Sequence, residues 1–299
     1  MVRALVTRAL PDTSALPLRR LRASGSTNAL FRLGDDLLVR LPRQPGGTAT
    51  IEKESRWVPR LAKRLPVAVP EVVAVGEPGH GYPERWSVVR WIDGTPPAVV
   101  AGDGGAGASP AWLATDLADL VRTLGEVEVP PEALDDPDLR WYRAAPLGTQ
   151  DEATRLAIEQ CRGIAGLDVD LDAALAVWDA AVSLPGASDV VAGHWLHADI
   201  AAENLLVRDG RLAALLDFGA LCVGDPTVDL IVAWEVLDRV GREAFRTASG
   251  ADEAKWLRGR AWALSLALQT FPYYWTTMPG RCASRLAVVA AVLSDATDD

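Results

Sequence analysis

Two short motifs separated by a predicted hairpin restrict the fold of this 299-residue chain more than any other feature. The first motif runs through residues 197–204 (HADIAAEN) and contains Asp199 and Asn204, and the second is Asp217-Phe218-Gly219. Between them, two apolar runs flank Asp209-Gly210, a dipeptide typical of tight β-hairpins. Because the two strands of a hairpin begin and end at the same edge, we expect Asn204 and Asp217 to lie close together.

The side chains of these motifs are the types that phosphoryl transfer requires. A carboxylate such as Asp199 accepts a hydrogen bond from the hydroxyl nucleophile, while cations absorb the charge of the phosphates. Asn204 offers a neutral oxygen and Asp217 an anionic one, and magnesium prefers such hard donors. The ordinary alternative is that Asp199 is a loop residue and Asp217 a turn former at a strand end. The complete set favours a magnesium-dependent phosphoryl-transfer site.

Residues around Asp199 are expected to support its loop. His197 is interpreted as a structural histidine that hydrogen-bonds the loop backbone, rather than as a base or a metal ligand. His194 lies three residues away, but no Cys or third His supports a zinc site. Asp225 before Pro226 is a typical helix start, with Asp as the N-cap. Asp229, one turn later, is expected to brace the loop.

The pattern of apolar residues changes along the chain from strand-like to helical. Strands are expected at 29–33, 37–41, 70–75 and 86–92, with a hairpin turn at 34–36 and one helix at 51–65 that Pro59 interrupts. Residues 94–110 are rich in Gly, Pro and Ala, as connectors are. Further helices are expected at 111–125, 151–162, 171–183, 226–248, 252–270 and 281–294.

This order of elements predicts an α+β protein with two lobes. We expect a small β-rich lobe over residues 1–93, a connector over 94–110, and a larger, mainly helical lobe over 111–299. The charge is divided in the same way: residues 1–100 hold 15 Lys+Arg against 9 Asp+Glu, and the remainder holds 15 against 31. A basic first third suits an anionic nucleotide, and an acidic remainder suits a cationic substrate or a metal, although acidic surfaces also simply keep proteins soluble.

Composition excludes several other classes of protein. We expect no membrane span because no apolar run approaches 18 residues, and no signal peptide because residues 1–10 lack a long apolar core. Scattered cysteines (Cys161, Cys222 and Cys282) form no disulfide framework, so a reduced, cytoplasmic setting is expected. No basic stripe with interleaved aromatic residues suggests a nucleic-acid partner.

The expected β-rich lobe contains one candidate for binding nucleotide phosphates. Arg40, on the strand 37–41, is suited to this role if Glu54 on the following helix holds it. An arginine on a strand is more often simply solvated. The segment Gly25-Ser26-Thr27-Asn28 offers backbone amides that could wrap phosphates, but it matches no established phosphate-loop motif.

The chain resembles the aminoglycoside phosphotransferase family, which has the protein-kinase-like fold. The resemblance runs from residues 33–43 to residues 272–274 and rests on H-x-D-x4-N, D-F-G and G-D-P-x-x-D-L. It implies that Asp199 is the catalytic Asp and that Asn204 and Asp217 bind Mg²⁺, with support from Asp229. It also implies ATP or GTP as the phosphate donor, with the nucleobase at the backbone of a hinge formed by the end of strand 86–92, through Arg90, Trp91 and Ile92.

The chain departs from the family pattern at three positions. The family loop usually reads H-G-D-x-H-x-x-N, whereas Ala198 replaces the Gly and Ala201 replaces the second His. Arg40 stands where kinase-like folds generally have Lys, and the two side chains differ in shape and hydrogen bonding. Related macrolide kinases also show Arg there, so this departure is a variant of the family pattern.

The acceptor is the least constrained part of the prediction. Glu235 and Asp238 are three residues apart, so on one helix they would share a face and could hold a cationic, polyamine-like sugar. Solvated carboxylates are the commoner case. The leading hypothesis is an O-kinase of small hydroxylated molecules, with antibiotics among its acceptors. A metabolic kinase of amino alcohols, amino acids or sugars, and a nucleotide-binding pseudokinase, are the alternatives. The choice between ATP and GTP, and between monomer and dimer, stays open.

Overall fold

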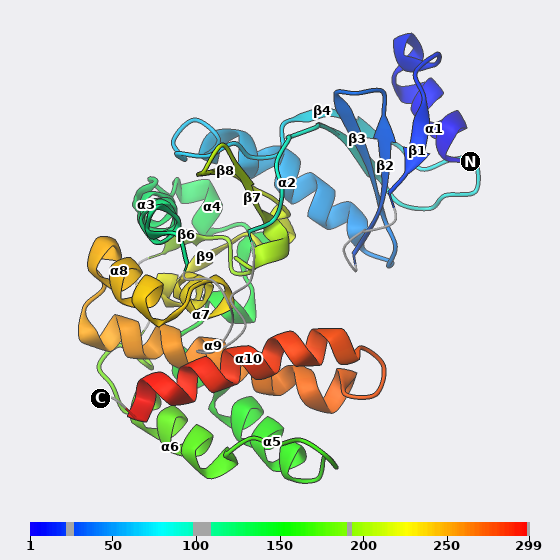
Figure 1. Ribbon diagram of the computed structural model, residues 1–299. Coiled ribbons are helices and arrows are strands. Elements are labelled where there is room, and N and C mark those ends of the chain that lie inside the picture. The colour runs from blue at the N-terminus through cyan, green and yellow to red at the C-terminus, as the bar shows by residue number, and fades with distance from the viewer. Residues whose placement is uncertain (22–26, 98–108, 190–192, 298–299) are drawn as a thin grey trace. The chain divides into compact units, whose positions relative to one another are not determined.

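The computed structural model describes residues 1–21, 27–97, 109–189 and 193–297. The chain forms two compact units, one made of Met1–Gly94 and Ala213–Gly219 and the other of Thr95–Leu212 and Ala220–Asp299. The first unit is built on a β-sheet and the second is mainly helical (Figure 1), which confirms the predicted α+β class. The second part of the first unit, Ala213–Gly219, contains the D-F-G motif, which the sequence had led us to expect in the helical lobe.

The first unit contains a five-stranded antiparallel sheet in the order β1-β2-β3-β5-β4. Its hairpin β2–β3 is the one predicted: Leu33 pairs with Leu37, and Gly34 takes the left-handed conformation with φ 59°. Three further strands complete the sheet. The bounds are β1 (Leu18–Arg20), β2 (Asn28–Leu33), β3 (Leu37–Pro42), β4 (Val72–Gly76) and β5 (Trp86–Arg90).

A short helix at the N-terminus, α1 (Val2–Ala9), was not anticipated from the sequence. Its Leu5 and Val6 are fully buried in a cluster with Val39 and Trp86 of the sheet. Burial of two large aliphatic side chains stabilises such a helix by several kcal/mol, at roughly 1.5–3 kcal/mol each. Tertiary packing therefore accounts for an element too short to be stable alone.

Helix α2 (Gly47–Leu61) begins and ends four residues earlier than the predicted helix 51–65. Its N-terminus is capped from a distance, because the Glu84 carboxylate accepts hydrogen bonds from the backbone amides of Gly46 (3.1 Å) and Thr48 (3.0 Å). These bonds lower the pKa of Glu84, the side-chain bond from Thr48 most of all. Pro59 lies in the last turn, so it interrupts little of the helix.

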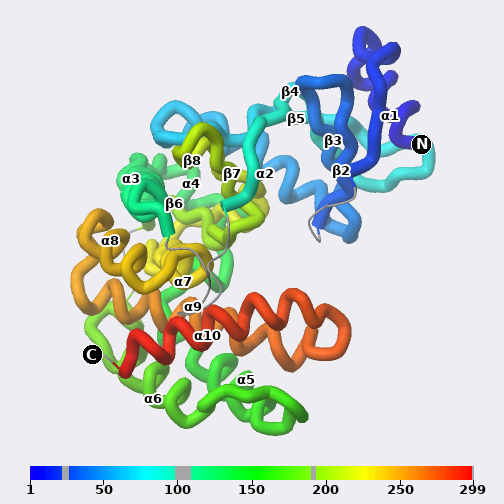
Figure 2. The backbone as a smooth tube through the Cα atoms, viewed as in Figure 1, coloured from blue at the N-terminus to red at the C-terminus, as the bar shows by residue number. Residues whose placement is uncertain are grey.

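The second unit contains five of the six helices predicted after residue 110, in nearly the predicted places. Helix α9 packs against α5, α6 and α10, and Figure 2 shows α9 and α10 running side by side. The core of the second unit holds several fully buried aromatic side chains, among them Trp178, Trp262 and Phe271. The bounds are α3 (Ala111–Glu126), α4 (Pro131–Leu134), α5 (Asp151–Arg162), α6 (Leu171–Val182), α9 (Glu253–Tyr274) and α10 (Pro279–Thr297).

The single helix predicted at 226–248 is wrong. The chain instead forms a 3-10 segment η7 (Pro226–Ile231), a short α7 (Val232–Val236) and then α8 (Arg239–Ser249). The break occurs because Leu237 is extended and Asp238 caps α8, its Oδ1 accepting the backbone amide of Gly241 at 2.7 Å. Asp is a strong N-cap residue, and the sequence pattern alone did not reveal that it starts a new helix here.

Two small sheets carry the motifs. Strand β6 (His194–Leu196) pairs with β9 (Cys222–Gly224), and β7 (Leu205–Arg208) pairs with β8 (Arg211–Leu215). Asp209 and Gly210 both have positive φ, 52° and 70°, as the predicted Asp-Gly hairpin turn requires.

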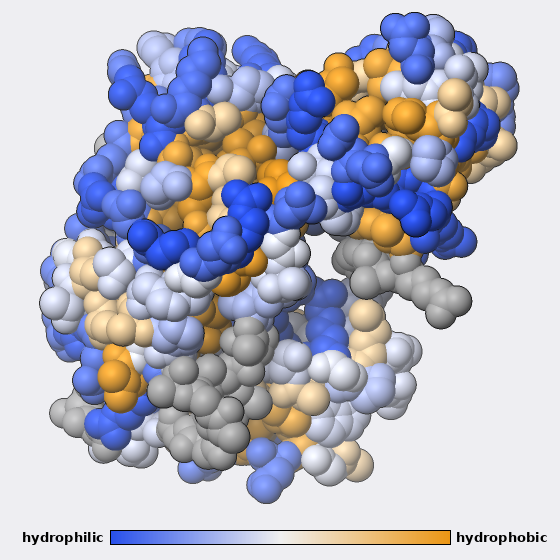
Figure 3. Space-filling model, turned by 45° about the horizontal axis from the view of Figure 1, so that its top comes forward, coloured by the Kyte–Doolittle hydropathy of each residue, from blue (hydrophilic) through white to orange (hydrophobic). Residues whose placement is uncertain are grey.

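The surface of the protein contains both hydrophilic and apolar residues. On the face shown in Figure 3, areas of apolar residues lie among hydrophilic ones. The exposed large apolar side chains Val73, Leu156 and Val240 come from different elements. Within the described ranges, no helix is both long enough and apolar enough to cross a membrane.

Candidate active site

The loop that carries Asp199 is held by a buried carboxylate. It leaves β6 at Leu196 and turns at Ala198, which is fully buried and has φ 62°, a conformation that costs an L-residue about 1–2 kcal/mol. Both oxygens of Asp229 accept backbone amides of this turn: Oδ2 from His197 at 2.8 Å and Oδ1 from Ala198 at 2.6 Å. The loop therefore depends on η7, the segment on which Asp229 lies.

Burial sets the electrostatics of this carboxylate. Burial raises the pKa of Asp229 to about 6, against the opposing effect of His197 and of the two backbone hydrogen bonds. His197 itself is fully buried. The predicted hydrogen bond from the His197 side chain to the loop backbone stays a prediction, since the bond found here is made by its backbone amide.

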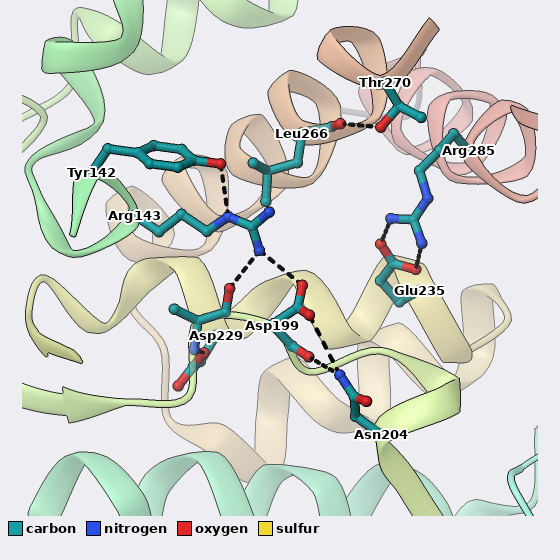
Figure 4. Close-up of polar contacts among 10 residues, drawn as sticks. Tyr142, Arg143, Asp199, Asn204, Asp229, Glu235, Leu266, Thr270 and Arg285 are labelled. Atoms are coloured by element: carbon teal, nitrogen blue, oxygen red, sulfur yellow. Dashed lines mark hydrogen bonds and ion pairs between the residues drawn. The ribbon is translucent and has the colours of Figure 1, made fainter. Parts of the chain in front are cut away.

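Asp199 has a half-exposed side chain and a charged partner. Nη1 of Arg143 donates to Oδ1 of Asp199 at 2.8 Å and to the carbonyl oxygen of Ala198 at 2.7 Å (Figure 4). Nε of Arg143 donates to the hydroxyl of Tyr142 at 3.0 Å. Arg143 and Tyr142 belong to the 3-10 turn η3 (Tyr142–Ala144), more than 50 residues before the loop in sequence.

Asn204, at the end of the 3-10 turn η5 (Ala202–Asn204), faces the same residue. Its side-chain nitrogen donates to the backbone oxygen of Asp199 at 2.9 Å and lies 3.4 Å from Oδ2 of Asp199. This orientation uses the amide nitrogen inside the loop, and it leaves Oδ1 as the atom of Asn204 with the chemistry of a metal ligand.

The first unit contains the predicted phosphate-binding pair. Both terminal nitrogens of Arg40 contact Glu54, Nη1 to Oε2 at 2.7 Å and Nη2 to Oε1 at 3.0 Å, and both side chains are buried. Burial lowers the pKa of Arg40, while Glu54 and Asp217 together raise it by more, so the net shift is upward. Glu54 thus holds Arg40 in the way the sequence had suggested.

Asp217 lies in the same unit as this pair. Its Oδ1 is 3.8 Å from Nη2 of Arg40, and its side chain is about one-third exposed. Asp217 has φ 58°, and its Oδ1 also accepts the amide of Gly219 at 3.4 Å. Lys53 of α2 donates to the carbonyl of Gly219 at 2.8 Å, so the D-F-G segment is tied to the helix that carries Glu54.

The predicted hinge begins where β5 ends. Arg90 is the last residue of β5, and Nε of its exposed side chain lies 3.5 Å from Oε1 of Glu71. The backbone amide of Trp91 donates to the carbonyl of Asp36 at 2.8 Å, so that amide is already used within the sheet. Ile92 follows outside any strand. The backbone amide of Arg90 likewise donates to the carbonyl of Glu71, at 2.9 Å. Of the three predicted residues, Arg90 and Trp91 therefore have backbone amides that do not suit a nucleobase.

Glu235 and Asp238 do not form the predicted acidic face. Glu235 ends up buried in α7, where its two oxygens meet the guanidinium of Arg285 on α10 (Figure 4). Asp238 lies beyond the helix break and accepts the amides of Gly241 and Ser109. Both carboxylates are thus engaged with partners inside the protein, and their expected pairing on one helix face is wrong.

One residue of the site, Arg143, was missed from the sequence, and so was Glu84, which caps helix α2. Arg143 and Glu84 act on segments that lie far from them along the chain, and neither stands in a recognisable motif. The segment Trp141-Tyr142-Arg143, with two aromatic residues before an arginine, was the one available signal for Arg143. Conversely, the suggested phosphate loop 25–28 begins outside the described residues, which resume at Thr27. The proximity of Asn204 to Asp217 stays a prediction, because these residues belong to different units.

Comparison with known proteins gives a consistent result. Residues 19–263 match the model of the family described as the phosphotransferase enzyme family. No curated protein matches the chain. Among solved structures, the GDP and kanamycin complex of APH(2")-IIIa is 19% identical, with a TM-score of 0.68 over 99% of this chain and 98% of that one. The macrolide 2'-phosphotransferase MphH from Brachybacterium faecium is 23% identical, with a TM-score of 0.60 over 93% and 92%.

Proposed function

This chain belongs to the phosphotransferase enzyme family, and we propose that it transfers the γ-phosphoryl group of ATP or GTP to a hydroxyl group of a small molecule. The observation that carries the proposal is the family match over residues 19–263, which includes Asp199, Asn204 and Asp217. Several of the matched structures were solved with GDP, ADP or ATP, which supports a nucleotide as the phosphate donor.

Asp199 is assigned to the acceptor hydroxyl. Its Oδ1 is taken by Arg143, and Oδ2 has only a long contact, 3.4 Å, to Asn204. With the side chain about half exposed, Oδ2 is the oxygen that an incoming hydroxyl can reach. It accepts the hydroxyl hydrogen bond, orients the oxygen for in-line attack and takes up the proton as the new P–O bond forms. The bond from the γ-phosphorus to the bridging oxygen breaks, and the nucleoside diphosphate leaves.

Asn204 and Asp217 are each assigned to magnesium because each offers an oxygen with the chemistry of a magnesium ligand. The amide nitrogen of Asn204 is committed to Asp199, and Asp217 presents a partly exposed carboxylate. Magnesium is commonly held by one or two protein oxygens together with substrate phosphates. When bound, the ion would neutralise charge on the phosphates.

Arg40 is assigned to the nucleotide phosphates, and the backbone at Ile92 to the nucleobase. Glu54 fixes the guanidinium of Arg40 through two hydrogen bonds, and arginine suits planar, bidentate contact with phosphate oxygens. His197 and Asp229 are assigned to support of the catalytic loop.

The acceptor is proposed to be an antibiotic-like hydroxylated compound. Relatives of this fold include proteins solved with kanamycin, gentamicin and streptomycin, and others described as macrolide phosphotransferases. Because Glu235 and Asp238 are engaged internally, they do not supply free carboxylates for a polycationic sugar. The sequence-based argument for a polycationic sugar therefore loses its two carboxylates, and a metabolic hydroxyl compound is the second candidate.

A nucleotide-consumption screen tests the proposal. Purified protein with magnesium and either ATP or GTP is offered aminoglycosides, macrolides, peptide antibiotics and small hydroxylated metabolites. We expect at least one compound to raise consumption well above the rate without acceptor. Nucleotide binding without acceptor-dependent consumption across the whole panel would contradict the proposal and favour a pseudokinase.

A further inference from the structure

Arg143 contacts the side chain to which the proposed function assigns the acceptor hydroxyl. One nitrogen, Nη1, reaches both Oδ1 of Asp199 (2.8 Å) and the carbonyl oxygen of Ala198 (2.7 Å). We propose that Arg143 is a positioning residue, which fixes the Asp199 carboxylate so that Oδ2 is presented to the acceptor hydroxyl. This inference rests on the proposed function, and it adds a residue outside the motifs that identify the family.

Arg143 is itself held in place, as a positioning residue must be. Its side chain is only 18% exposed, and Nε donates to the hydroxyl of Tyr142. The guanidinium carbon lies 4.6 Å from the ring centre of Trp141 and 5.6 Å from that of Tyr142, within the range of cation–π attraction. Burial lowers the pKa of Arg143, but Tyr142 and Asp199 raise it by more, so the guanidinium stays charged.

The contacts of Arg143 differ in kind from those of Asp229. Asp229 accepts two backbone amides and so fixes the path of the loop. Arg143 binds the Asp199 side chain, which is about half exposed and would otherwise rotate between rotamers. Without Arg143, the half-exposed Asp199 carboxylate can be solvated by water, so the ion pair itself is expected to add little to stability. The effect of Arg143 is therefore expected in the rate of the reaction rather than in the stability of the fold.

Substitutions at Arg143 separate geometry from charge. Arg143→Met should lower kcat by roughly 10²-fold, the cost of a misplaced reacting group, with KM for the nucleotide within about twofold. Arg143→Lys keeps the charge but loses the planar fork, so about a tenfold loss is expected. Methylguanidine added to Arg143→Ala should restore part of kcat.

Arg122→Met is the matched control. It removes an arginine that pairs with Asp119 and Glu126 on the exposed surface of α3, and kcat should not change. A folded Arg143→Met or Arg143→Lys enzyme with kcat within twofold of wild type would overturn the proposal. A loss of kcat that is accompanied by a clear fall in Tm and is not rescued by methylguanidine would also overturn the proposal, since a purely structural role predicts that result.

A structural readout keeps the test independent of the proposed function. In crystals of Arg143→Met, the Asp199 carboxylate should leave its wild-type rotamer or occupy more than one. An unchanged, single rotamer would contradict the inference. If wild-type protein transfers no phosphate to any acceptor, the proposed function fails, while the rotamer of Asp199 still decides whether Arg143 positions it.

Discussion

Two arginine–carboxylate pairs, one in each compact unit, have the same chemistry in different surroundings. Arg40 and Glu54 form a two-point pair with side-chain exposures of 7% and 4%. Arg143 and Asp199 form a one-point pair with exposures of 18% and 48%. In the first pair, which we call the closed pair, both carboxylate oxygens are used by the arginine. In the second, which we call the open pair, one oxygen, Oδ2, is left for another partner.

The difference shows how one type of ion pair, arginine with a carboxylate, serves two purposes. Removing one partner of a buried pair leaves an uncompensated charge, which costs about 3–5 kcal/mol. Removing one partner of a half-exposed pair costs little, because water solvates the remaining charge. Breaking the Arg40–Glu54 pair should therefore appear first in stability, and breaking the Arg143–Asp199 pair should appear first in turnover.

The largest expected effect is on the open pair. Asp199→Ala should reduce kcat on the order of 10³-fold, because a positioned base contributes about 10²–10⁴-fold. Nucleotide affinity should stay within threefold, since Asp199 is assigned to the acceptor. Steady-state kinetics and nucleotide titration measure the two quantities. Asp179→Ala, on the exposed surface of α6, is the control, and a loss of less than tenfold in Asp199→Ala would remove Asp199 from its assigned role.

The next effect is on the closed pair. Glu54→Gln keeps the shape of the side chain but removes the carboxylate that pairs directly with the buried Arg40, leaving only the more distant Asp217 at 3.8 Å. The free energy of unfolding should therefore fall by about 3 kcal/mol, the lower end of the range for breaking a buried pair. Urea denaturation measures the change. Glu52→Gln, on the same helix but paired with Arg85 at the surface, should change the free energy of unfolding by less than about 0.5 kcal/mol. Equal effects of the two substitutions would contradict the larger cost expected for breaking a buried pair.

A smaller effect depends on pH and on Asp229. Its pKa is raised from 3.8 to about 6, so between these values the folded state binds more protons than the unfolded state. Stability from this group is therefore fully present below the unfolded pKa and is lost as the pH rises through about 6. At about 1.4 kcal/mol per unit, the loss amounts to roughly 3 kcal/mol. The measurement is urea denaturation of wild type and Asp229→Asn between pH 4 and pH 7.

Asp229→Asn should abolish that part of the pH dependence. The difference in unfolding free energy between the variant and wild type should therefore change between pH 4 and pH 7. Asp252 supplies a control of opposite sign, because the amide of Lys255 lowers its pKa. Its contribution is present above the unfolded pKa and is lost as the pH falls through the folded pKa. If the difference in unfolding free energy between Asp229→Asn and wild type does not change with pH, the Asp229 carboxylate does not titrate as described.

The smallest effect is expected at Ala198, the family departure next to Asp199. Ala198→Gly relieves a left-handed conformation worth about 1–2 kcal/mol. It also loses a buried methyl group, about 0.8 kcal/mol, and gains unfolded-chain entropy worth about 0.4–1 kcal/mol. These terms nearly cancel, so the change in unfolding free energy should be below about 1 kcal/mol, with kcat within threefold. A tenfold gain in kcat would mean that Ala198 distorts the loop around Asp199.

The sequence predicted those parts of the fold that depend on local patterns. The hairpins at Gly34 and at Asp209-Gly210, and the helices α5 and α6, follow from turn residues and from apolar periodicity, and the structure has them at or within one residue of the expected bounds. The pair Arg40–Glu54 could also be predicted, since the strand and the helix that carry it follow one another in sequence.

The remainder depends on contacts between distant segments, which periodicity does not reveal. Glu84 caps α2 from 36 and 38 residues away and so shifts its start. Asp238 stops one helix and starts another because Ser109 and Gly241 bind it. Arg143 reaches Asp199 across 56 residues, from a 3-10 turn that carries no motif.

The central claim is that the protein transfers a phosphoryl group to an acceptor hydroxyl, with Asp199 holding that hydroxyl. The most direct measurement is ³¹P NMR of the wild-type reaction with nucleoside triphosphate, magnesium and the acceptor that the screen identifies. The account predicts a new phosphomonoester resonance that grows in step with the nucleoside diphosphate and is absent with Asp199→Ala. Inorganic phosphate as the sole product, or an undiminished phosphomonoester signal with Asp199→Ala, would contradict it.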